Sequence, residues 1–276
     1  MTVRFFVRRA LLPALLSATW CSTATHPAAA AEHHFGFTEE SLVLDQGKTE
    51  LTPWTTVRAG RSAYYSKLEG RLELGYGFAK NLQGSLFWNF SSVAKDTQLP
   101  AASETTRLAV TDFESVSGNL KYKLSDPIAD SLGSAIALEG SFGPELGAVF
   151  VQAIVDKQFG SLLLAGNVTG EAIWPLDRSD AGVEKELSLG LSAGYFVTPK
   201  LVPGIEVRDT NGFGSKLERS VIYLGPSVSW VTSGFWATLA VEPQLTALKG
   251  GTPHEQHLDL DENERVQARA LVGFEL

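Results

Sequence analysis

The stretch Lys67–Phe78, KLEGRLELGYGF, decides the fold class, because its residues alternate between two kinds of side chain. Leucine and aromatic residues fill the even-numbered positions from Leu68 to Phe78, interrupted by Gly70. Charged residues and glycine fill the odd-numbered positions. A helix would spread both kinds around its axis, so the period of two predicts a β-strand with one apolar and one polar face.

The same alternation recurs along the chain, for example in Leu82–Phe90, Glu186–Phe196 and Phe235–Leu245. In a transmembrane barrel one face of each strand meets lipid and the other meets the lumen, which produces this pattern. The sequence therefore predicts an all-β protein, a transmembrane antiparallel up-and-down β-barrel of about 12 strands, with ten or fourteen as alternatives. The expected strands are 48–58, 67–78, 82–92, 111–124, 134–142, 148–158, 161–173, 184–197, 201–209, 219–231, 235–245 and 265–275.

The length of each join between these strands depends on whether the strand before it has an even or an odd number. Joins after even-numbered strands are mostly tight, such as Ala79–Asn81 and Phe159–Gly160, whereas most joins after odd-numbered strands are longer. Outer-membrane barrels have short periplasmic turns and longer extracellular loops, so an even strand number places both termini in the periplasm. We expect Val93–Val110 to be the loop that could fold inward as a constriction, and 246–264 to be a solvated acidic surface loop.

The first 31 residues predict a cleaved signal peptide. Three arginines lie within Met1–Arg9, an apolar stretch runs from Ala10 to about Thr19, and Ala29 and Ala31 form the cleavage pattern. The apolar stretch is too short for a transmembrane helix, which needs roughly 20 residues. A bulky Trp20 before Cys21 argues against a lipoprotein anchor. We therefore expect export to the bacterial outer membrane, a periplasmic N-terminal segment at 32–47 and a barrel at 48–276.

Charge and cysteine content argue against a nucleic-acid-binding protein and against a protein held together by disulfides. Removing three arginines with the signal peptide leaves 20 basic against 31 acidic residues, a formal net charge of −11. Nucleic-acid binding needs clustered Lys and Arg, so no nucleic-acid partner is expected. The single cysteine, Cys21, is removed as well, so no disulfide framework is expected. A closed barrel does not need one, because its strands complete each other's backbone hydrogen bonds.

Charged residues at inward positions are the candidate functional residues. An isolated charge away from bulk water is costly, so acids and bases on one inward face should pair. If a water path survives, these charges set selectivity, and their excess of Glu favours cationic or neutral solutes; if the lumen is closed, they form a structural ionic core. We predict that the lumen is lined by Glu69, Arg71, Glu73, Lys121, Lys123, Glu139, Glu171, Glu186, Glu206, Arg208, Glu242, Arg265 and Arg269.

Aromatic residues gather near the ends of the expected strands, as two interfacial girdles require. Trp54, Trp88 and Trp174 are assigned to the outer rim, and Tyr76 and Tyr195 to the inner rim. The alternative is a soluble β-sandwich with an aromatic core. The C-terminal strand favours the barrel, because it alternates up to the last residue. We expect barrel-assembly machinery to recognise this C-terminal membrane-insertion signal, which comprises Val272, Phe274 and Leu276.

No catalytic, cofactor or metal site is expected. The histidines after the signal peptide are His33, His34, His254 and His257, and none lies on an expected strand beside a serine. In the loop HEQHLDLDEN, 254–263, Asp259, Asp261 and Asn263 resemble the first positions of a calcium loop that would begin at Asp259. However, its sixth position is Glu264 where glycine is needed, and its twelfth is not glutamate.

Two stretches, GFTEESLVLDQGKTELTPW and LELGYGFAKNLQGSLFWNFS, lie between residues 36 and 90. There the chain resembles a group of small bacterial outer-membrane barrels that includes transporters named after the meta-cleavage pathway of phenol degradation. The resemblance implies a barrel and a transport role, but no binding residues. We therefore expect a passive channel or transporter for small solutes in contact with outer-membrane lipid and lipopolysaccharide. The alternative is a non-conducting structural or interaction barrel whose outer loops bind a partner or lipopolysaccharide.

Overall fold

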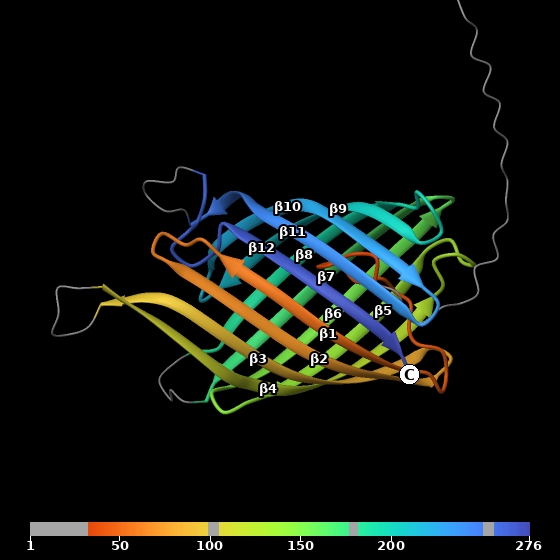
Figure 1. The fold of residues 1–276 in the computed structure, drawn as a ribbon, viewed down its shortest axis with the longest axis horizontal. Helices are drawn as coiled ribbons and strands as arrows, with labels where there is room; N and C mark the ends of the chain where they lie inside the picture. The colour runs from red at the N-terminus through yellow and green to blue at the C-terminus, as the bar shows by residue number, and fades with distance from the viewer. Residues whose placement is uncertain (1–32, 99–104, 177–181, 251–256) are drawn as a thin grey trace, which may run out of the picture.

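The computed structural model describes residues 33–98, 105–176, 182–250 and 257–276, which form one closed antiparallel barrel (Figure 1). Each strand pairs with its neighbours in the chain, and the last strand pairs with the first. The strands are β1 (Thr49–Ala59), β2 (Tyr65–Ala79), β3 (Leu82–Gln98), β4 (Thr105–Ser125), β5 (Gly133–Phe142), β6 (Leu146–Phe159), β7 (Leu162–Pro175), β8 (Glu184–Tyr195), β9 (Leu201–Phe213), β10 (Leu217–Thr232), β11 (Phe235–Lys249) and β12 (Val266–Glu275). The prediction of twelve strands is confirmed.

The period of two in the sequence becomes two faces of the barrel wall. Leucines on the outward face, such as Leu86, Leu120 and Leu239, are 51%, 54% and 50% exposed. Carboxylates on the inward face, such as Glu206 and Glu242, are buried. Apolar residues outside and charged residues inside reverse the usual arrangement of a water-soluble protein, and suit a wall that faces lipid.

The barrel closes between β1 and β12 along most of both strands. Leu51 lies opposite Phe274 at one end of this pair, and Ala59 lies opposite Val266 at the other. The rings of Phe274 and Phe235 pack with their centroids 5.4 Å apart. The closed ring leaves no strand edge, which is the condition for a sheet to cross the lipid.

Two loop predictions are wrong. The expected loop Val93–Val110 is mostly strand, because β3 continues to Gln98 and β4 begins at Thr105, and this hairpin extends beyond the barrel (Figure 1). It therefore does not fold inward as a constriction; residues 99–104 lie outside the described part. The loop before β12 is not wholly a solvated surface loop, because Asp259, Leu260 and Glu264 are buried. The Gln244 side chain of β11 both accepts from the Asp259 amide and donates to its carbonyl.

Trp54 does not belong to the outer aromatic girdle. It lies on the inward face of β1, where its ring is 6.2 Å from that of Phe87 on β3. The sequence interpretation failed here because it assigned aromatic residues to the lipid face by type rather than by parity. Small apolar clusters also lie inside the barrel, one formed by Val231, Trp236 and Leu271.

No helix in the described part of the chain is long and apolar enough to cross a membrane.

Gly225 of β10 provides a test of the register between β10 and β11. A Cβ at this position would lie 1.7 Å from the carbonyl oxygen of Val241, so β11 would have to move. We expect Gly225→Ala to lower the free energy of unfolding by about 1–3 kcal/mol, as overpacking does. Heat-modifiable gel migration across a urea series measures this change. Gly140→Ala is the control, because a Cβ at Gly140 would have no described atom within 4 Å. Equal urea midpoints for the two variants would contradict the register.

Candidate functional site: the lumen and its N-terminal segment

The segment from His33 to Gly47 lies inside the barrel, near the end that carries the short turns (Figure 1). We call it the N-terminal segment. It runs along the inner wall, from β11, where Thr238 donates to the His33 carbonyl, to β2, where the Gly47 amide donates to the Gly77 carbonyl. The sequence prediction separated a periplasmic segment, 32–47, from the barrel, whereas the described residues 33–47 lie within the lumen. Which side of the membrane this end faces stays a prediction. This segment could not be assigned from alternation, because it is not a strand.

A single carboxylate, that of Glu206 on β9, holds the start of the segment. The amide of Gly36 donates to Oε1 at 2.7 Å, and the amides of Phe37 and Thr38 donate to Oε2 at 2.8 and 3.1 Å. Hydrogen bonds to a charged group are each worth about 1.5–3 kcal/mol. Gly36 is also required sterically, because a Cβ there would lie 2.5 Å from the Cβ of Ala240.

Three further side chains of the wall bind the middle of the segment. Asn167 on β7 accepts from the Glu39 amide at 2.6 Å and donates to its carbonyl at 2.9 Å. Asp156 on β6 accepts from the amide and the hydroxyl of Ser41 at 3.1 and 2.6 Å. Lys121 on β4 donates to the Glu40 carbonyl at 2.7 Å. The wall therefore supplies the partners that the segment's backbone lacks.

Charge and burial set the protonation of two residues on the segment. Burial lowers the pKa of His33, and the nearby Lys121 ammonium lowers it further, so the ring is neutral at neutral pH. Burial alone would raise the pKa of Glu39, but the attraction of Lys121, whose Nζ lies 3.4 Å away, holds that pKa below its ordinary value. The His33 ring packs against Trp236 at a centroid distance of 5.0 Å.

Ion pairs inside the barrel join strands that are not adjacent in the wall. Arg71 on β2 contacts Glu139 on β5 at 2.8 Å, and Arg208 on β9 contacts Glu242 on β11 at 2.8 Å. Arg219 on β10 contacts Glu186 on β8 at 3.2 Å. Because at least one intervening strand separates the partners in the wall, these side chains meet on the inward face of the wall, inside the lumen.

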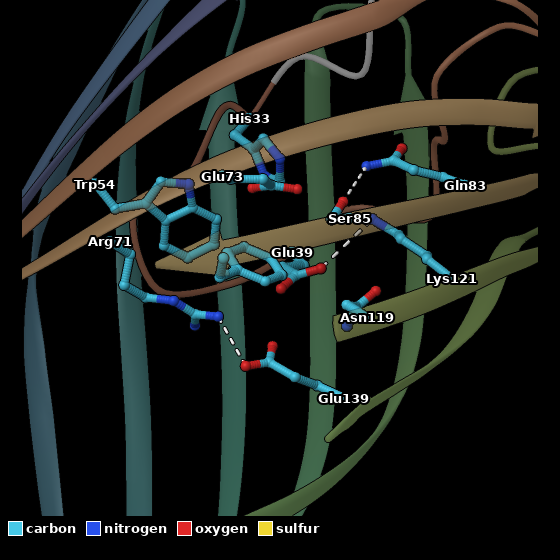
Figure 2. Close-up of a pocket in the computed structure, with 11 residues that line it drawn as sticks. His33, Glu39, Trp54, Arg71, Glu73, Gln83, Ser85, Asn119, Lys121 and Glu139 are labelled. Atoms are coloured by element: carbon cyan, nitrogen blue, oxygen red, sulfur yellow. Dashed lines mark hydrogen bonds and ion pairs between the residues drawn. The ribbon is translucent and has the colours of Figure 1, made fainter. Parts of the chain in front are cut away.

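The interior retains two cavities beside the N-terminal segment. The larger, about 380 Å³, is lined by residues of β12 and β1–β7, and the smaller, about 40 Å³, lies against His33 and Glu39 of the segment. Figure 2 shows the smaller cavity, with the Arg71–Glu139 and Lys121–Glu39 pairs on one side. Trp54, Arg71 and Glu139 line both cavities, so these three residues form the boundary between them.

The mouth at the opposite end is narrowed by the loop before β12. Glu264 of this loop is 3% exposed and accepts from Nε of Arg61 at 2.9 Å, with Arg58 at 3.9 Å. The Tyr223 hydroxyl of β10 donates to the Glu264 carbonyl at 3.2 Å. Among the described residues, the lumen is therefore occupied by chain at both ends.

The structure brings most of the predicted lumen residues together. Besides the pairs above, Glu69 contacts Arg58 and Lys67, and Arg269 donates to Thr56 and to the Gly36 carbonyl. Glu73 and Glu171 line the two cavities, one each, without a described ion-pair partner. Lys123 contacts Asp126 at the turn after β4, and Arg265 lies exposed just before β12. The functional role of the predicted lumen residues stays a prediction. The expected absence of catalytic, cofactor and metal sites also stays a prediction. His254 and the signal peptide lie outside the described residues.

Several residues of the site were missed from the sequence. Arg58, Asp156 and Asn167 share the inward parity of their strands, so alternation alone could have identified them. Lys67 and Phe87 follow the same rule. The residues of the N-terminal segment carried no comparable signal.

One family model matches residues 27–149 and 151–276, and it is described as DUF6662, a family of unknown function. No match to a curated protein was found. The chain is similar to a solved structure described as the COG4313 outer membrane channel from Pseudomonas putida F1, at 14% identity and a TM-score of 0.59, over 86% of this chain and 98% of that one.

A second similar structure is the NanC porin, at 10% identity and a TM-score of 0.53, over 82% of this chain and 100% of that one. These identities show a shared fold. The expected resemblance to outer-membrane barrels is thus confirmed for the fold, whereas the link to phenol-degradation transporters stays a prediction.

The contact between Glu206 and the segment can be tested by hydrogen exchange. Glu206→Gln replaces one accepting oxygen by an amide donor, so the amides of Gly36, Phe37 and Thr38 lose at least one acceptor. We expect these amides to exchange about tenfold faster, as the loss of a charge-assisted hydrogen bond implies. Glu218→Gln, at an exposed position, is the control. Unchanged exchange in Glu206→Gln would contradict the docking of the segment.

Proposed function

Since the chain belongs to DUF6662, a family of unknown function, its activity must be inferred from its own residues, and we propose that it is a passive channel for small solutes in the bacterial outer membrane. Residues 1–31 would direct export, the short turns and both termini would face the periplasm, and the longer loops would face outward. The similar folds of solved outer-membrane channels and porins are consistent with this proposal.

The observation that carries the proposal is the polar space left beside the N-terminal segment. The segment takes its hydrogen bonds mainly from β4, β6, β7 and β9. The smaller cavity lies against β1–β5, and the larger lies against β12 and β1–β7. They meet at the Arg71–Glu139 pair, which involves two side chains rather than backbone. Rotation of these side chains would join the cavities into one charged path, whose residues would act as a selectivity filter does in pores.

The N-terminal segment would act as the constriction of this channel. A 12-stranded barrel is intermediate between filled eight-stranded barrels and open barrels of sixteen or more strands, so a short segment is enough to restrict its lumen. A weak preference for cations is expected, because the chain after the signal peptide has 31 acidic and 20 basic residues.

Single-channel recording in planar bilayers tests the proposal. The refolded chain without residues 1–31 should give resolved conductance steps, and a form that also lacks 33–46 should give larger steps, because its lumen is wider. Folding is checked by heat-modifiable migration. If the shortened form does not fold, the double variant Asp156→Asn/Glu206→Gln, which weakens the anchors of the segment, serves instead. Folded protein that stays silent in both forms would refute the channel.

One observation favours the second candidate, a non-conducting barrel whose outer loops bind a partner or lipopolysaccharide. Chain occupies the lumen at both ends, through the N-terminal segment and the buried residues Asp259, Leu260 and Glu264. This candidate predicts silence in bilayers, together with binding of lipopolysaccharide to the folded barrel, which a co-migration assay measures.

A further inference from the structure

Arg269 on β12 is a guanidinium in the larger cavity without an acidic partner. Its Nε donates to the Thr56 hydroxyl at 3.0 Å and its Nη1 to the Gly36 carbonyl at 3.2 Å. No carboxylate in the described part of the chain lies within ion-pair distance of it. The rings of Phe37 and Trp54 flank the guanidinium at 4.4 and 5.8 Å. An aromatic setting stabilises the cation in part and leaves its charge available to an anion.

Glu171 on β7 is the matching residue of opposite charge. It lines the same cavity, and the described residues give it neither a hydrogen bond nor an ion pair. The other charged residues around this cavity are paired: Arg58 and Lys67 with Glu69, Lys67 with Glu114, and Arg71 with Glu139. One guanidinium and one carboxylate are left over.

The two unpaired groups lie on opposite walls. In the ring of twelve strands, β12 and β7 are five strands apart, close to the largest separation that the ring allows. A ligand that neutralises both must therefore carry its positive and negative charges at opposite ends. The adjacent ammonium and carboxylate of a free α-amino acid cannot reach both walls, whereas the ends of a peptide separate by about 3.3–3.6 Å for each extended residue.

The rest of the cavity offers groups that suit a peptide. Asn89 on β3 is 8% exposed and lines the cavity, and its Oδ1 has no hydrogen-bond partner, although its Nδ2 donates to Ser115 and Ser117. This oxygen can accept from a backbone amide. Phe150 and Ile173 line the same cavity, although the inward face is otherwise mainly polar. They provide an apolar surface for side chains of the ligand.

We propose that the larger cavity binds a short zwitterionic peptide of two or three residues with apolar side chains. Its terminal carboxylate pairs with Arg269, its terminal ammonium pairs with Glu171, and its side chains pack against Phe150 and Ile173. The cavity of about 380 Å³ falls within the usual range for small-molecule sites, about 300–1,000 Å³. The inference rests on the proposed function, because the peptide would reach this cavity through the lumen.

Titration calorimetry on the folded chain in detergent tests the proposal without requiring conduction. The probes are the dipeptide leucyl-leucine, its N-acetyl form, which lacks the ammonium, and its C-terminal amide, which lacks the carboxylate. We expect leucyl-leucine to bind about tenfold more tightly than either blocked form, as the loss of one charge-assisted contact implies. Free leucine should bind no better than the blocked forms.

Two variants assign each end of the peptide. Arg269→Gln should remove the difference between leucyl-leucine and its amide, and Glu171→Gln should remove the difference between leucyl-leucine and its N-acetyl form. Lys157→Gln is the control, since Lys157 donates to the Asp130 carbonyl at the short-turn end, and it should bind like the original chain. If a variant does not fold, the three probes on the unchanged chain still decide.

Equal binding of the three probes, or no measurable binding of leucyl-leucine, would overturn the proposal. The two inferences fail separately: conduction without peptide binding refutes the peptide site, whereas peptide binding without conduction refutes the channel.

Discussion

The lumen is organised by the need of the N-terminal segment for hydrogen-bond partners. Strands of a closed barrel satisfy each other's backbone groups, but a segment inside the barrel has no neighbouring strand. Glu206 meets this need for three successive amides, and Asn167 and Asp156 meet it for the next ones. Removing these polar side chains would leave buried amides unpaired, which is costly. The position of the segment, and with it the width of the lumen, follows from these few contacts.

The position of the segment also decides which charges of the wall remain available. Glu206 and Lys121 are used by the segment, and Arg208 and Glu242 pair beside it. The space that the segment leaves beside β12 and β1–β7 retains the two cavities and the two unpaired groups. A narrow barrel can therefore hold a structural ionic core and, as proposed above, a solute path in the same lumen. The sequence interpretation treated these two roles as alternatives for the whole lumen.

Most of the wall could be predicted from the sequence, because a lipid face and a lumen face impose a period of two on every strand. Strand ends agree with the structure within a few residues, except at the β3–β4 hairpin, where polar residues continue the strands beyond the expected ends. The contents of the lumen could not be predicted. The stretch 33–47 has no period, and its contacts join residues more than 100 positions apart, such as Ser41 and Asp156. Parity places Arg269 inward, but only the fold shows that it lacks an acidic partner.

Disulfide trapping tests most directly whether the N-terminal segment lies inside the lumen. Cys21 is the single cysteine of the sequence and precedes the expected cleavage site, so cysteines can be introduced without competition. Ser41→Cys combined with Asp156→Cys places two thiols where a hydroxyl and a carboxylate now meet at 2.6 Å. Mild oxidation of the folded protein in membranes should join them, whereas Ser41→Cys with Ser188→Cys, on β8, should stay unlinked. Absence of a link in the first pair, or equal linking in both, would contradict the account.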